Sequence, residues 1–112
     1  YKMSDDTLYK KSYLNRLGEL KERSPKVAAK FMQFEHEVFN TGTIPPKTKE
    51  LIAIAVAHTT GCPYCIEAHV AKYKKLGGTM DEILEAVTVA AALKAGAAIS
   101  HSVNAINAFE RE

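Results

Sequence analysis

Prolines divide this chain into short helical segments. Each of the four prolines stands at or just before a position where a helix would begin, and the places are Ser24–Pro25, Pro45–Pro46 and Cys62–Pro63. Proline is favoured at the first helical position but breaks a helix interior, so each helix must end before the next proline. No segment shows the strict alternation of apolar and polar residues that is typical of a strand. The sequence therefore predicts an all-α fold.

The helices follow from these boundaries and from the spacing of apolar residues. We expect about six helices in one domain, 1–112, covering residues 5–22, 25–39, 46–58, 63–75 and 80–109, with the last segment bent or split at Gly96. Residues 59–61 are expected to form a turn. The third helix is apolar on every side between residues 51 and 57, so it should be buried all round. The Tyr and Lys residues that end the fourth helix should face solvent.

Composition and charge disfavour several functions. The 112 residues include 15 basic and 13 acidic side chains, interspersed along the chain, and the net charge of +2 gives no case for binding nucleic acid or a membrane surface. We find no segment of membrane-spanning length and no signal peptide, and therefore expect a cytoplasmic protein. The alanine-rich stretch 83–109 should pack on the core and on a second subunit. His101 within it is expected to be structural or interfacial rather than catalytic.

The two cysteines of the chain stand in the sequence Cys62-Pro63-Tyr64-Cys65, and His69 follows four residues later. Residues three and four apart share a helix face, so Cys62, Cys65 and His69 should line one side of the fourth helix. In a reducing compartment, two close cysteines are more often catalytic or metal-binding than a permanent bridge. The helix N-terminus would favour the thiolate of Cys62, and His69 that of Cys65. These residues are candidates for a redox-active dithiol.

Glu50 is expected to join this group from the preceding helix. The third and fourth helices are separated by only a few residues, so they should form an antiparallel hairpin. From Glu50 to His58 the chain rises roughly 12 Å, and from Cys62 to His69 it returns roughly 10 Å. Glu50 and His69 would then lie side by side. A carboxylate, an imidazole and a thiol in this order are a common arrangement for activating a nucleophile.

These residues resemble a known family motif. The pattern of Glu50, eleven residues, Cys62-Pro63-Tyr64-Cys65, three residues and His69 is similar to the core of the alkylhydroperoxidase D-like (AhpD-like) proteins of the carboxymuconolactone decarboxylase superfamily. The resemblance spans about residues 45–108, and its fixed spacing is more specific than a C-x-x-C pair alone. It implies an all-helical trimer or hexamer. Tyr64 departs from the pattern, because the best-known members carry a histidine there. Decarboxylase members lack the cysteine pair, which disfavours decarboxylation here.

The resemblance also implies a thiol-dependent peroxidase that acts on an organic hydroperoxide. Cys65 would attack the peroxide and become a sulfenic acid, and Cys62 would supply a proton and then close the disulfide. Glu50 and His69 would form the proton relay. A thiol reductant, such as a lipoyl-bearing protein, would reduce the disulfide again. No cofactor is implied.

The same residues have other interpretations at this point. Helix-dipole reasoning alone would make Cys62, rather than Cys65, the more reactive thiol. The cysteines could instead bind zinc, with His58 and His69 completing four ligands, in a non-enzymatic metal-binding or redox-sensing module. Glu50 could simply complement the dipole at a helix start, and His69 could be a packed core residue.

Overall fold

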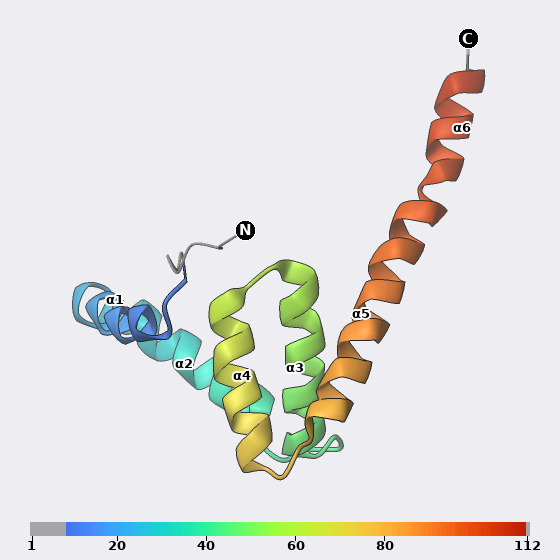
Figure 1. Cartoon of the computed structure of the whole chain (residues 1–112). Helices are drawn as coiled ribbons and strands as arrows, with labels where there is room; N and C mark the ends of the chain where they lie inside the picture. Colours follow the sequence, from blue (N-terminus) through green and yellow to red (C-terminus); the bar gives the residue numbers. More distant parts are fainter. Residues whose placement is uncertain (1–8, 112) are drawn as a thin grey trace, which may run out of the picture.

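Helices make up nearly all of the chain that the structure describes, which is residues 9–111 of a computed structural model (Figure 1). Within this range there are six α-helices, a leading 3-10 helix and no strand. The bounds are η1 Lys11–Arg16, α1 Leu17–Arg23, α2 Pro25–Phe39, α3 Pro46–Thr60, α4 Pro63–Lys75, α5 Met80–Ser100 and α6 Ser102–Glu110. The prediction of an all-α fold is confirmed.

Proline and capping residues start the helices as the sequence predicted. A proline occupies the first turn of α2, α3 and α4. The Cys62 sulfur caps α4 by accepting a hydrogen bond from the Cys65 backbone N–H at 3.2 Å. At α5, the Thr79 hydroxyl accepts from the Glu82 N–H while the Glu82 carboxylate accepts from the Thr79 N–H, which is a capping box. These contacts set where α4 and α5 begin.

Two of the predicted helix boundaries are wrong. Thr59 and Thr60, expected in a turn, are the last residues of α3. Of the three residues expected in that turn, only Gly61 lies outside the helix, and it has a positive φ of 70°. Each threonine hydroxyl donates a hydrogen bond to the carbonyl three residues back. The first helix, expected over 5–22, starts as a 3-10 helix and becomes α-helical only at Leu17. Its first four expected residues lie outside the described part of the chain.

The predicted interruption of the last helix lies at His101, not at Gly96. Glycine inside a helix costs only about 1 kcal/mol and keeps the backbone hydrogen bonds, so α5 continues through Gly96. At His101 the ring Nδ1 accepts a hydrogen bond from the Asn104 side-chain amide at 3.1 Å. The two helices, α5 and α6, nevertheless continue in nearly one line (Figure 1).

The core is small and is built on α3. This helix lies between α4, which runs antiparallel to it, and α5 (Figure 1). Ile54 and Tyr73 are fully buried there, and Ile83 joins them from α5. Tyr73 was expected on a solvated face, and that expectation is wrong. The expectation that α3 is buried all round is also wrong for the single chain, because Ile52 and Val56 are 47% and 51% exposed.

An apolar arm extends away from this core. It consists of α5 beyond Ala90 together with α6, and all of its residues are exposed (Figure 1). The radius of gyration of 18.6 Å compares with about 13 Å for a compact domain of this length. The large apolar side chains exposed on the arm are Leu93, Ile99, Val103, Ile106 and Phe109. The single chain therefore leaves a substantial apolar surface in contact with water.

The arm is part of a helical stretch that contradicts the expectation that no segment reaches membrane-spanning length. The stretch Met80–Glu110, 31 residues, is long and apolar enough to cross a membrane by length and composition, so the expectation is wrong on those two criteria. One such helix is weak evidence for a membrane span. The same apolar surface fits burial against a second subunit.

The turn between α4 and α5 packs closely against the core. The Gly78 N–H donates a hydrogen bond to the Tyr73 carbonyl at 2.9 Å, and a Cβ atom on Gly78 would overlap the Tyr73 ring. Burial, followed by the neighbouring Glu82 carboxylate, raises the pKa of Tyr73, which keeps its hydroxyl neutral. Glycine is therefore required at position 78 by the space available.

Gly78→Ala should lower the free energy of unfolding by about 1–3 kcal/mol, because the added methyl group displaces a buried ring. Gly18→Ala is the control, since a Cβ atom there has no neighbour within 4 Å, and it should be neutral or slightly stabilising. Urea unfolding measures both effects. Equal stability of the two variants would contradict the packing of Tyr73 against Gly78.

Candidate active site

A buried hydrogen bond joins α3 to α4. The His69 Nδ1 lies 2.5 Å from Glu50 Oε2, and the two residues are only 8% and 5% exposed. The hairpin geometry expected from the sequence is therefore present. Because a carboxylate accepts hydrogen bonds, Nδ1 carries the proton, and Nε2 is the ring nitrogen left to face a reacting group. A carboxylate this deeply buried depends on such a partner.

The two cysteines form a disulfide across the first turn of α4. They occupy different positions relative to the surrounding protein. Cys62 precedes the helix and caps it through its sulfur, so the helix N-terminus would stabilise a thiolate there. Cys65 lies inside the helix, one turn before His69, and lines a pocket together with it. Both thiols are half-buried.

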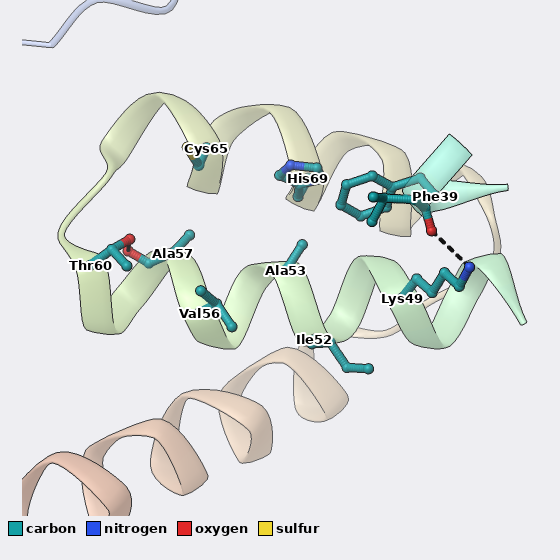
Figure 2. A pocket seen from close by; sticks show the side chains of 10 residues that line it. Phe39, Lys49, Ile52, Ala53, Val56, Ala57, Thr60, Cys65 and His69 are labelled. Carbon is teal, nitrogen blue, oxygen red and sulfur yellow. Dashed lines mark hydrogen bonds between the residues drawn. The ribbon is translucent and has the colours of Figure 1, made fainter. Parts of the chain in front are cut away.

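An apolar pocket of about 460 Å³ opens beside Cys65 and His69 between α2, α3 and α4. Figure 2 shows His69 between Cys65 and Phe39, with the α3 side chains across from them. Two other polar residues, Lys49 and Thr60, line the pocket. The rest of the lining is apolar and consists of Val38, Phe39, Ile52, Ala53, Val56 and Ala57. A molecule with an apolar body could therefore bring a reactive group to Cys65.

Two residues of this site, Phe39 and Lys49, were not predicted from the sequence. The Phe39 ring stacks on the His69 imidazole, with centroids 4.9 Å apart and planes 24° apart. The Lys49 ammonium donates hydrogen bonds at 2.7 Å to the carbonyls of Val38 and Asn40, on either side of Phe39. The sequence alone places Phe39 at the end of the helix expected over residues 25–39 and does not indicate its partner. No local signal shows that the end of α2 returns to α4.

The other candidate residues lie elsewhere. His101, at the junction of α5 and α6, does not line the pocket. The Tyr64 ring meets the edge of the Tyr9 ring, with centroids 5.7 Å apart. The ring of His58 bonds the Ile54 carbonyl at 2.8 Å. Within residues 9–111 no three His, Cys, Asp or Glu residues are grouped to hold a metal ion. The four-ligand zinc set considered from the sequence is therefore not assembled.

The fold and this constellation match one protein family. The sequence profile of the carboxymuconolactone decarboxylase family matches residues 25–108. The chain therefore belongs to the carboxymuconolactone decarboxylase family, whose superfamily includes the AhpD-like proteins. The similarity to that group stated from the sequence is confirmed at this level.

Relatives and solved structures agree with this assignment. The chain is 42% identical over 90 residues to uncharacterized protein 4 in the cox locus of Paracoccus denitrificans, covering 80% of this chain and 81% of that protein. An uncharacterized Haemophilus influenzae protein is 38% identical over 92 residues, 82% of this chain and 81% of its own. The crystal structure of a carboxymuconolactone decarboxylase family protein from Legionella pneumophila superposes with a TM-score of 0.71 at 31% identity, covering 89% of each chain. A Methanobacterium thermoautotrophicum protein gives 0.72 at 30% identity, covering 76% of this chain and 98% of its own.

His69→Ala should lower the free energy of unfolding by about 3 kcal/mol, because it leaves the Glu50 carboxylate buried without its partner. His36→Ala, at an exposed histidine of α2, is the matched control and should change stability by less than about 0.5 kcal/mol. Urea unfolding at neutral pH compares them. If the two variants were equally stable, the buried hydrogen bond would not exist in solution.

Proposed function

We propose that this protein is a thiol-dependent peroxidase that reduces organic hydroperoxides through the Cys62–Cys65 pair. One observation carries the proposal. Cys65 and His69 line the same pocket, and His69 is hydrogen-bonded to the buried Glu50. A thiol, an imidazole and a carboxylate in this order form the arrangement that activates a nucleophile. Membership of a superfamily that includes AhpD-like proteins is consistent with it.

The proposed reaction uses each residue in turn. The Cys65 thiolate attacks the outer oxygen of the hydroperoxide, the O–O bond breaks, and the leaving alkoxide takes a proton to become an alcohol. Cys65 is then a sulfenic acid. Cys62 attacks its sulfur, the hydroxyl leaves as water after taking a proton, and the disulfide forms. A dithiol reductant supplies two electrons and two protons to restore both thiols. His69 and Glu50 carry the protons.

The arrangement of the cysteines supports this division of roles. Cys62 lies at the helix N-cap, where a thiolate is stabilised, whereas Cys65 faces the pocket that a substrate would enter. Access to the pocket therefore decides which thiol meets the peroxide. The two sulfurs are bonded while α4 keeps its start at Pro63, so the disulfide is compatible with the helix. The apolar lining favours a hydroperoxide with an apolar body.

Tyr64 occupies the position between the cysteines where the best-known AhpD-like proteins carry a histidine. Its ring packs against Tyr9 from the N-terminal segment. In the proposed mechanism, Glu50 and His69 therefore relay protons without a contribution from position 64, and Cys62 supplies a proton before it closes the disulfide. The reductant is proposed to be a dithiol such as a lipoyl-bearing protein, in the cytoplasm, where a disulfide can be reduced in each cycle.

Cys65→Ser should abolish consumption of tert-butyl hydroperoxide in the presence of dihydrolipoamide, because the attacking sulfur is lost. Cys62→Ser should still be oxidised at Cys65, giving a sulfenic acid that mass spectrometry detects after trapping, but should not turn over. Loss of peroxide is followed in the presence of excess dithiol. Full activity of Cys65→Ser would refute the assignment of the nucleophile.

We also propose that the protein is a homo-oligomer, a trimer or a hexamer. The exposed apolar side chains of the arm, and the partly exposed Ile52 and Val56 on α3, support this. Many large apolar side chains exposed on one element commonly mark an interface. Burial against copies of the same chain would give the arm the neighbours that it lacks within the single chain.

Ile99→Glu should dissociate the oligomer, because it places a charge in the apolar surface of the arm, where the native side chain is 72% exposed in the single chain. Asn15→Glu introduces the same charge at an exposed position on η1 and should leave assembly unchanged. Size-exclusion chromatography with light scattering gives the mass of each variant. A wild-type protein that runs as a monomer would contradict the proposal.

A further inference from the structure

An imidazole that serves a neighbouring thiol must be held in one orientation. The last side-chain torsion of histidine is broad, so rotamer preference alone does not fix the plane of the ring. The hydrogen bond from Nδ1 to Glu50 fixes the direction of one ring edge. Because hydrogen bonds to a carboxylate oxygen accept a broad range of approach directions, this one contact restrains the ring plane only loosely. A second contact would narrow the plane and so direct Nε2.

Phe39 makes this second contact. Its ring lies nearly parallel to the His69 imidazole, with an angle of 24° and a centroid separation of 4.9 Å. Stacking of two flat rings restricts rotation of each out of the shared orientation. His69 thus has Glu50 at one edge and Phe39 on one face. Cys65 lies one turn before His69 along the pocket (Figure 2).

Phe39 is itself held in place by Lys49, the residue next to Glu50. Phe39 is the last residue of α2, and backbone carbonyls at the end of a helix have no partner within it. The Lys49 ammonium bonds the carbonyls immediately before and after it, those of Val38 and Asn40, at 2.7 Å each. A single turn of α3 therefore supplies both restraints on His69. Glu50 bonds the ring directly, and Lys49 anchors the aromatic side chain that stacks on it.

We propose that Phe39, anchored by Lys49, is a positioning residue that sets the plane of the His69 imidazole and directs Nε2 toward Cys65. The proposal rests on the proposed function in that it takes His69 to act on the Cys65 thiol. It assigns Phe39 a role that depends on its flat ring. A branched apolar side chain such as leucine would fill much of the same space, but it would not hold the plane of the imidazole.

The test compares Phe39→Leu, Phe39→Tyr and the control Phe34→Leu, which changes a phenylalanine that is 66% exposed on the same helix. Fully reduced protein is treated with iodoacetamide at neutral pH, and mass spectrometry gives separate rates for Cys65 and Cys62. Phe39→Leu should slow alkylation of Cys65 by about 10-fold or more, because the imidazole is no longer aligned. Phe39→Tyr, which retains the ring, should restore most of the rate. Alkylation of Cys62 should be unchanged in all three variants.

Lys49→Met is an independent second variant. It keeps the aromatic ring of Phe39 and removes the ammonium that anchors it. It should also slow alkylation of Cys65 selectively, and it keeps the proposal testable if Phe39→Leu does not fold, as judged by circular dichroism. Wild-type rates at Cys65 in a folded Phe39→Leu, or in Lys49→Met, would overturn the proposal. Equal losses at both cysteines would overturn it too, since they would show an effect that is not confined to the thiol served by His69.

The assay contains no peroxide, so it separates this inference from the proposed function. A wild-type protein that does not consume hydroperoxide, together with selective slowing of Cys65 in Phe39→Leu, would refute the peroxidase and leave the positioning role standing. Active wild-type protein with unaffected Cys65 in Phe39→Leu would refute the positioning role alone.

Discussion

The hydrogen bond between His69 and Glu50 ties the two helices of the central hairpin together inside a small core. Neither side chain is stable at that depth without the other, because burying a charged or polar group requires a partner. The bond therefore sets the register of α4 against α3. It also determines that Nδ1 carries the ring proton and that Nε2 is left without one. The arrangement that could support chemistry is thus the same one that supports the fold.

Around this bond, the protein gives its two cysteines different surroundings although they are one helical turn apart. The sulfur of Cys62 is held at the helix N-terminus by a backbone N–H, which favours a stable thiolate. Cys65 lies beside the imidazole at an apolar pocket. Helix electrostatics and access thus favour different thiols as the one that reacts. In the proposed mechanism access prevails, because a peroxide must first enter the pocket.

The hairpin is well packed, but the chain as a whole is not. Tyr73 and Ile54 are buried under α5, whereas the outer half of α5 and all of α6 are exposed. Apolar side chains that stay in water contribute nothing to stability through the hydrophobic effect. Assembly of several copies, as proposed, would bury this surface and complete a core that one chain of 112 residues leaves unfinished.

The sequence by itself determined the helical class, most helix starts and the meeting of Glu50 with His69, because proline positions, caps and the helical rise are local quantities. One of its errors was local and another was tertiary. Gly96 was expected to break a helix that continues, and Tyr73 was assigned to solvent. Only the tertiary structure decided that Phe39 stacks on His69 and that Lys49 holds it, because both contacts depend on the path of α2 back to the hairpin. Helical periodicity identifies the apolar face of an element but not its partner.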